Sequence, residues 1–327
     1  MIRPLLRSAG GPPYGSVETV IEVQNLTKRY GDTVAVDRLS FTVRPGQVTG
    51  FLGPNGAGKS TTMRMMLGLD RPATGRVLID GRPYDRLTEP LRRVGALLEA
   101  TAVHRGRRAQ DHLWWLARSN RIPKTRVREV LALVGLESVA RKRSKGFSLG
   151  MSQRLGIAAT LLGDPPVLLF DEPLNGLDPE GIVWIRNLMK KLAAEGRTVF
   201  VSSHLMNEMA LTADHLVVIG RGRLLADTTV TQFVAAHTRS FVRVRTPEPE
   251  RMWNALAAAG VTVTQAADGT LEADGTEAAT IGEIAAASGL IVHEVATQTA
   301  SLEEAFMRLT GDVVDYRAGH QAGGPQW

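Results

Sequence analysis

GPNGAGKST occupies residues 53–61, where an apolar run suited to a strand (47–52) gives way to a helix-forming stretch (59–67). This is the spacing of a phosphate-binding loop, in which glycines let backbone N–H groups converge on phosphate oxygens beside a helix N-terminus. Lys59 supplies a cation, and Ser60 offers a hydroxyl ligand to Mg²⁺. The residues predicted to bind a nucleoside triphosphate are Gly53, Pro54, Asn55, Gly56, Ala57, Gly58, Lys59, Ser60 and Thr61.

Two carboxylates follow a second apolar run, in the sequence VLLFDEP at residues 167–173. Open α/β sheets bind ligands at the carboxyl ends of their strands, so Asp171 is placed to hold Mg²⁺ through water. Glu172 would then face the γ-phosphate, where a carboxylate can act as general base toward water. His204 follows another apolar strand (198–201), which favours a γ-phosphate contact linked to that base over a capping or core role. Glu172 and His204 are the predicted catalytic residues.

A third segment, GFSLGMSQRLGIAATLL at residues 146–162, lies between these motifs. Ser148 can cap the helix that follows, and its hydroxyl and the Gly150 N–H can point at an anion. With the motifs in this order, residues 17–227 resemble the ATP-binding cassette (ABC) family. The pairing of VGALLEA with SLGMSQRLGIA is similar to the subgroup that serves bacitracin, lantibiotic and daunorubicin-type resistance exporters.

The resemblance implies roles for further residues and names ATP and Mg²⁺ as cofactors. Tyr30 would stack on adenine, His204 would be the switch histidine, and the loop 174–178 (LNGLD), which contains Asp178, would cross a dimer interface. The signature segment, which meets the nucleotide of the opposite subunit, would comprise Phe147, Ser148, Leu149, Gly150 and Met151.

Two positions depart from the family pattern. The signature, usually LSGGQ, reads FSLGM, so Leu149 disfavours a positive φ and Met151 lacks an amide hydrogen bond. Glu99 stands where a glutamine usually contacts Mg²⁺ and senses the γ-phosphate. A glutamate there could ligate Mg²⁺ with a full charge, at the cost of repulsion with the phosphate. Gln110 is the weaker alternative, because its surroundings look helical.

Composition limits the function classes. The chain has 327 residues and no cysteine, which excludes disulfides and thiolate chemistry and fits a cytoplasmic protein. No segment holds about eighteen uninterrupted apolar residues, so we expect a separate transmembrane permease and a peripheral position on the inner face of the cell membrane. Residues 1–16 and 318–327, rich in glycine with proline or glutamine, are expected to be disordered tails.

Charge is distributed unevenly along the chain. Residues 241–327 hold 5 Lys+Arg and 12 Asp+Glu, which gives this part a net charge of −7. Because the whole chain has a net charge of +6, residues 1–240 have a net charge of +13. A solvated surface is the first explanation, proximity to a membrane surface the second and nucleic acid the third. Because no nucleic-acid-binding motif is present, no nucleic-acid partner is expected.

The fold class predicted for residues 17–227 is an α/β P-loop nucleoside triphosphatase domain of the ABC type, with a mixed sheet and an antiparallel edge. The expected edge is a hairpin (19–26 and 33–43), and the expected parallel strands are 47–52, 93–98, 166–171 and 197–201. A helical subdomain is inserted at about residues 100–160. Trp114 and Trp115 within it are expected to pack in the core, with a permease-facing groove as the alternative.

Residues 240–311 are predicted to form a small α+β accessory domain. The expected order is strand (241–245), helix (250–259), strands (262–265 and 270–273), helix (278–288) and strand (290–295), closed by a helix at 301–309. No acid/base pair, metal spacing or glycine-rich loop occurs in this part. We expect this domain to function in dimerisation, regulation or choice of partner.

These observations predict an ATP-hydrolysing subunit that powers export of a drug, antibiotic or peptide through a separate permease, acting as a homodimer. A soluble cassette ATPase acting on ribosomes or DNA is one alternative, although the chain has neither a second cassette nor a long coiled coil. A weakly hydrolysing regulator is another, suggested by Leu149 and Met151 and opposed by Glu172 and His204.

Overall fold

The computed structural model describes residues 20–99, 103–237, 241–266, 268–298 and 302–310. This part of the chain forms two compact units, which divide between Val230 and Thr231. Both segments expected to be disordered tails, 1–16 and 318–327, lie outside the described residues. Within those ranges, no helix combines the length and the apolar character that crossing a bilayer requires.

A six-stranded sheet forms the centre of the first unit, in the order β5-β6-β7-β3-β8-β9. The first five of these strands are parallel, and β9 runs antiparallel to β8 at the edge. The four predicted parallel strands correspond to β3, β5, β6 and β7, whereas β8 and β9 were not anticipated. Their bounds are β3 (Val48–Leu52), β5 (Val94–Leu97), β6 (Val167–Asp171), β7 (Thr198–Ser203), β8 (His215–Gly220) and β9 (Arg223–Thr229).

The predicted hairpin is present, but it lies in a separate sheet. β1 (Ile21–Tyr30), β2 (Thr33–Val43) and β4 (Thr74–Ile79) form an antiparallel sheet in the order β2-β1-β4. Its buried face packs against the face of the parallel sheet, where the ring of Phe41 lies 5.6 Å from that of Phe51. The antiparallel edge of the central sheet is therefore β9, because the hairpin covers a face of that sheet instead of extending it.

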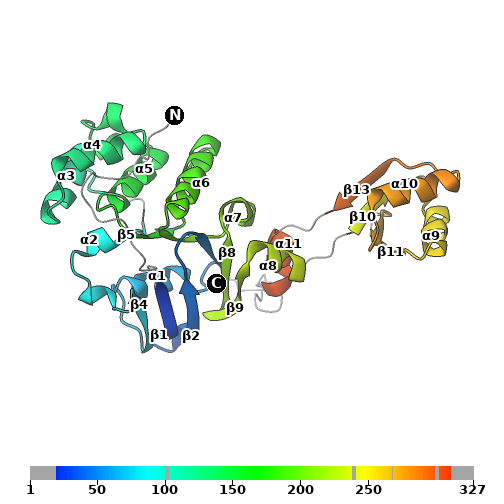
Figure 1. Ribbon diagram of the computed structural model, residues 1–327, viewed down its shortest axis with the longest axis horizontal. Coiled ribbons are helices and arrows are strands. Elements are labelled where there is room, and N and C mark those ends of the chain that lie inside the picture. Colours follow the sequence, from blue (N-terminus) through cyan, green and yellow to red (C-terminus); the bar gives the residue numbers. More distant parts are fainter. Residues whose placement is uncertain (1–19, 100–102, 238–240, 267, 299–301, 311–327) are drawn as a thin grey trace, which may run out of the picture. The chain divides into compact units, whose positions relative to one another are not determined.

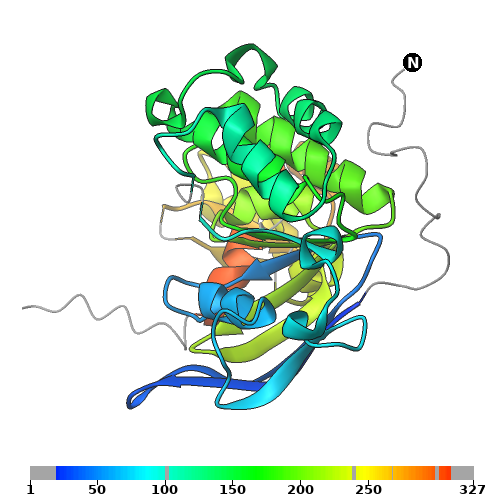
Figure 2. The same cartoon turned by 90° about the vertical axis from the view of Figure 1, so that its left-hand side faces the viewer.

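Helices cover the rest of the first unit. Figures 1 and 2 show α3, α4, α5 and α6 on one side of the central sheet, with α1 and the β1-β2-β4 sheet on the other. Trp115 on α3 is 55% exposed, so the expectation that it packs in the core is wrong. The α-helices of this unit are α1 (Lys59–Met66), α2 (Pro90–Arg93), α3 (Ala109–Ser119), α4 (Lys124–Leu133), α5 (Leu149–Thr160), α6 (Pro179–Ala194) and α7 (Met206–Thr212), and 3-10 turns occur at Tyr84–Arg86, Glu137–Val139 and Ser144–Gly146. The next helix, α8 (Val230–His237), starts at the division and belongs to the second unit from Thr231 on.

The second unit contains an antiparallel sheet in the order β11-β12-β10-β13 with its own apolar core. The last strand begins at Glu294, four residues later than predicted. Gly289, with φ of +60°, ends the preceding helix, and the Leu290 N–H bonds to the Ala285 carbonyl at 2.9 Å, so Leu290 packs in the core before pairing begins. The elements are β10 (Phe241–Arg245), α9 (Pro249–Ala258), β11 (Thr262–Gln265), β12 (Leu271–Asp274), α10 (Ala278–Ala287), β13 (Glu294–Gln298) and α11 (Leu302–Thr310).

Candidate functional site

The predicted phosphate loop joins β3 to α1, in the first unit. Gly56 and Gly58 have φ of +80° and +102°, a region that residues with a side chain rarely adopt. A Cβ on Gly58 would lie 2.5 Å from the carbonyl oxygen of Ala35, and one on Gly53 would lie 2.6 Å from that of Ile219. Close packing therefore requires glycine at both position 53 and position 58. At position 58 the positive φ is a second reason for glycine.

The Lys59 side chain is buried beneath this loop. Its Nζ donates to the carbonyls of Gly53 and Pro54, at 2.6 and 3.3 Å, and lies 3.8 Å from Oε1 of Glu172. Burial lowers the pKa of Lys59 below its ordinary value, and the negative charges of Glu172 and Asp171 oppose that shift. A cation in such a low-dielectric position interacts strongly with a phosphate oxygen. Ser60 is exposed on the first turn of α1, beside the half-buried Thr61.

The acidic pair stands at the carboxyl end of β6, beside β7. Asp171 lies opposite Ser202 in the parallel register, and the Ser202 hydroxyl donates to Oδ1 of Asp171. The same hydroxyl accepts from the Glu172 N–H at 3.0 Å. Glu172 has φ of +48°, so the chain turns sharply there as it leaves the sheet.

His204 follows the last residue of β7, as its position after a strand predicted. Its Nδ1 lies 2.9 Å from Oε2 of Glu172, and its side chain is 42% exposed. Glu172 thus contacts Lys59 through one carboxylate oxygen and His204 through the other. The structure brings together Lys59, Asp171, Glu172 and His204: Lys59 begins α1, and the other three lie at or just beyond the carboxyl ends of β6 and β7.

The signature segment caps and begins α5. The Ser148 hydroxyl accepts from the Met151 N–H at 3.2 Å, as an N-cap residue does, after a half-buried Phe147. Leu149 is the first helical residue and has no positive φ, so the glycine-like freedom expected to matter at this position is not required. The Leu149 side chain is 51% exposed and covers Gly176, where an added Cβ would meet its Cδ2 at 2.0 Å.

The loop 174–178 lies against this segment within one chain. Leu177 Cδ2 would be 3.5 Å from a Cβ on Gly150. Asp178 caps α6 by accepting from the Gly181 N–H at 3.0 Å. The contacts of the signature therefore run to its own 174–178 loop and leave Ser148 and Gly150 at the surface or half-buried.

Tyr30 lies at the end of β1, 49% exposed. Its hydroxyl bonds to Oδ2 of Asp70 at 3.1 Å, and Asp70 is in turn paired with Arg64 of α1. The ammonium of Lys28 stands 5.0 Å from the centre of the ring. These contacts hold an aromatic ring next to the helix that begins at the phosphate loop.

Glu99 lies two residues beyond β5, and β5 pairs with β6, which carries Asp171. This strand-then-loop position is the one expected of the γ-phosphate sensor. Gln110 is instead the second residue of α3 and bonds to Asp111 at 3.4 Å, in the helical part of the unit. Glu99 therefore stays the predicted sensor, with Gln110 as the weaker alternative.

Two polar residues in the site were not singled out from the sequence. Ser202 orients the acidic pair, as described above. Gln153, 2% exposed on α5, donates from Nε2 to the Pro173 carbonyl at 2.7 Å and so ties the signature helix to the acidic strand. The VSSH sequence could have indicated Ser202, because alignment of two neighbouring parallel strands places it opposite Asp171.

The donor set fits Mg²⁺ bound partly by phosphate oxygens. Ser60, Asp171 and Glu99 offer hard oxygen ligands, which this ion prefers. In the described part of the chain, no group of three or more His, Cys, Asp or Glu side chains could hold a metal ion. A site with few carboxylates suits Mg²⁺, because this ion is commonly held by one or two carboxylates together with a substrate phosphate.

Comparison with known proteins agrees with this geometry. Residues 36–175 match the family model described as ABC transporter, residues 143–210 match an AAA domain model, and residues 240–303 match a domain of unknown function. An uncharacterized ABC transporter ATP-binding protein of Bacillus subtilis is 37% identical over 305 residues, covering 90% of this chain and 97% of its own length. A bacitracin transport ATP-binding protein of Enterococcus faecalis is 35% identical over 303 residues, with the same coverage of 90% and 97%.

A solved structure of a dimeric ATP-binding cassette, in a post-hydrolysis state with ADP and Pi, is 26% identical with a TM-score of 0.58. The match covers 64% of this chain and 98% of that one. The parallel sheet with its phosphate loop and acidic strand defines a P-loop nucleoside triphosphatase. The chain belongs to the family of ABC transporter ATP-binding proteins. It is an ATPase of the cassette type, as the order of its motifs predicted.

Proposed function

We propose that this protein hydrolyses ATP to drive export of an antibiotic, drug or peptide through a separate membrane permease. The observation that carries the chemistry is the contact of one carboxylate, Glu172, with both Lys59 and His204 at the phosphate loop. The export role is supported by the bacitracin transport relative, which matches over nearly its full length. This role would place the chain on the cytoplasmic face of a cell membrane.

In the proposed reaction, Gly53 to Thr61 and Lys59 bind the phosphates of ATP, and Tyr30 stacks on the adenine. Mg²⁺ supplies charge neutralisation of the phosphates, and Ser60, Asp171 and Glu99 are the residues that would hold it. Glu172 accepts a proton from water as the water oxygen attacks the γ-phosphorus and the bond to ADP breaks. His204 holds the Glu172 carboxylate in place through its Nδ1.

A second cassette completes the proposed site. Ser148 and Gly150 at the N-terminus of α5 would contribute a hydroxyl and backbone N–H groups to the nucleotide of the opposite chain. The exposure of Leu149 and the surface position of Ser148 support this arrangement, as does the dimeric state of the solved cassette. A homodimer is the form we propose, with Asp178 and its loop near the interface.

The first test is Mg²⁺-dependent ATPase activity of the purified chain, alone and with its permease in lipid. We expect activity that rises with the permease. Glu172→Gln should reduce the rate by about 10²- to 10⁴-fold, the range of general-base catalysis, while ATP still binds. Glu250→Gln, on the exposed side of α9 in the second unit, is the matched control and should be fully active.

Turnover by Glu172→Gln at the rate of the control would overturn the general-base assignment. Wild-type activity that does not respond to the permease would overturn the coupling to transport and leave an ATPase of another use.

A further inference from the structure

Two basic segments that are distant in the sequence lie side by side in the helical part of the first unit. They are residues 104–110 (HRGRRAQ) and 140–146 (ARKRSKG), here called the paired basic segments. Arg108 and Arg143 form an antiparallel bridge. Four backbone hydrogen bonds join the segments: Ala109 N to Lys142 O at 3.1 Å, Gln110 N to Ala140 O at 2.9 Å, Ser144 N to Arg107 O at 3.0 Å and Lys145 N to Arg105 O at 3.0 Å.

This pairing concentrates positive charge without compensation. Neither segment contains an acidic residue, and Arg107 is half-buried while the other cations are exposed. Within the described residues, no carboxylate lies at ion-pair distance from any of these cations, whereas Arg126 nearby is paired with Glu129 and Asp164. The cations of the segments are Arg105, Arg107, Arg108, Arg141, Lys142, Arg143 and Lys145.

Like charges on directly opposed strands destabilise their pairing. The fold nevertheless places Arg108 against Arg143 and holds the segments together through their backbones. The positive field is felt at buried His112, whose pKa is lowered first by burial and then by the charges of Arg107 and His104. A surface of this kind gains free energy when an anion binds to it.

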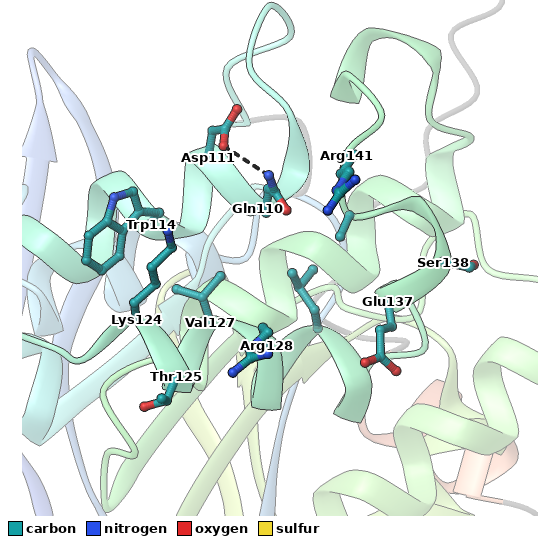
Figure 3. A pocket seen from close by; sticks show the side chains of 12 residues that line it. Gln110, Asp111, Trp114, Lys124, Thr125, Val127, Arg128, Glu137, Ser138 and Arg141 are labelled. Carbon is teal, nitrogen blue, oxygen red and sulfur yellow. Dashed lines mark hydrogen bonds between the residues drawn. The ribbon is translucent and has the colours of Figure 1, made fainter.

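Tryptophan side chains stand beside the cations. The Arg107 guanidinium lies 4.7 Å from the centre of the exposed Trp115 ring, and the Lys124 ammonium lies 5.5 Å from that of Trp114. Figure 3 shows Trp114 and Lys124 at one side of a pocket of about 750 Å³, with Arg128 and Arg141 farther along its rim. Buried Val127 and Leu131 supply apolar lining.

We propose that the paired basic segments, together with Trp115, bind the anionic headgroups of a lipid bilayer. Tryptophan is enriched at the level of lipid headgroups, and clusters of Lys and Arg are attracted to anionic lipid. An exposed surface that combines tryptophan with clustered cations matches a membrane interface. It matches nucleic acid less well, because single strands stack on aromatic faces and a cation already lies over each of these tryptophan rings. This contact goes beyond the proposed function, since it requires neither ATP nor a permease.

Sedimentation of the full chain with lipid vesicles tests the proposal. The protein is expected to bind vesicles of phosphatidylcholine mixed with phosphatidylglycerol, and not vesicles of phosphatidylcholine alone. Raising NaCl from about 0.1 to about 1 M should release it, because the Debye length falls from about 10 to about 3 Å.

The variant Arg141→Gln, Lys142→Gln, Arg143→Gln should lower the partition coefficient roughly 100-fold, at about fivefold per neutralised cation. The control Arg44→Gln, Arg82→Gln, Lys190→Gln removes the same charge from exposed sites outside the paired basic segments and should bind nearly as the wild type does. ATPase activity of the first variant should be unchanged, so failure of the lipid proposal and failure of the proposed function can be told apart.

Equal binding to neutral and anionic vesicles would overturn the proposal, as would equal losses in the two triple variants. Tighter binding to an RNA homopolymer than to anionic vesicles at the same salt would also overturn it, in favour of a nucleic-acid partner. If the triple variant fails to fold, Arg143→Gln alone decides the question through an expected loss of about fivefold.

Discussion

The Ser202 hydroxyl on β7 donates a hydrogen bond to Oδ1 of Asp171 on the neighbouring β6. It also accepts from the Glu172 N–H, so one side chain orients two successive acidic residues. Ser202 is fully buried, and its hydroxyl is engaged by both of these partners. We therefore regard it as a positioning residue.

Ser202→Ala should lower kcat by about 10- to 100-fold, since a hydrogen bond to a charged group contributes about 1.5–3 kcal/mol. KM for ATP should change much less, because the phosphate loop is untouched. Ser203→Ala is the matched control: it removes a buried hydroxyl that accepts from the Leu205 N–H at 3.0 Å. Steady-state ATPase kinetics of both variants provide the measurement, and equal kcat values would contradict the role of Ser202.

Lys59→Met should weaken ATP binding by about 10- to 100-fold, through loss of charge-assisted hydrogen bonds worth about 1.5–3 kcal/mol. Binding of a fluorescent ATP analogue measures this loss. Lys190→Met, at an exposed site on α6, is the control and should bind normally. Normal binding by Lys59→Met would contradict the assignment of the phosphate loop.

The stability of the nucleotide-free protein should depend on pH through the same lysine. Burial lowers the folded-state pKa of Lys59 below its usual 10.5, so the unfolded chain binds this proton more strongly. The free energy of unfolding therefore rises with pH between the lowered pKa and 10.5. Denaturant unfolding over alkaline pH should show the wild type gaining stability relative to Lys59→Met. A difference that stays constant or reverses would contradict the pKa shift.

Gly58→Ala should destabilise the first unit by about 1–3 kcal/mol, the cost of a strained backbone, and should abolish ATP binding. The added Cβ would lie 2.5 Å from the Ala35 carbonyl oxygen, a backbone atom that cannot easily move. Gly31→Ala is the control, because Gly31 also has a positive φ of +56° but has open space around its Cβ position. Thermal unfolding should place Gly58→Ala below the control, and identical midpoints would count against the close approach.

Leu149→Gly should not increase the ATPase rate, even though it restores the residue usual in the family signature. Leu149 already begins α5 without a positive φ, and a glycine inside a helix costs up to about 1 kcal/mol. ATPase assays of Leu149→Gly with the permease should give a rate within about threefold of the wild type. Ser148→Ala, by contrast, removes an N-cap of α5 that is worth about 1 kcal/mol. A large gain from Leu149→Gly would show that the leucine limits catalysis.

Local patterns in the sequence were enough to predict the phosphate loop, the acidic strand and His204. Each consists of consecutive residues whose chemistry is evident in one strand, one turn or one helix start. Ser202 and Gln153 could not be recognised in this way, because their partners lie 31 and 20 positions away. Their contribution depends on which strands are neighbours and in what register they pair.

The hairpin and Trp115 show the same limit at the level of packing. Alternating apolar residues predict β2 with its bounds and the first part of β1, whose predicted end at residue 26 falls four residues short of Tyr30. The pattern does not say whether the hairpin extends a sheet or covers its face. Helical spacing places Trp115 on α3, yet the side chain is exposed under the Arg107 guanidinium. Both outcomes are set by contacts between distant segments.

The pairing of β3 with β7 joins Val48 to Val199, and β3 also pairs with β8. The phosphate loop therefore acquires its neighbours, Asp171 and His204, only after the chain has closed very long loops, a slow step in folding. A nascent or partly folded chain has no complete nucleotide site. ATP can then stabilise only molecules in which the whole sheet has formed, so nucleotide binding reports completed folding of the cassette.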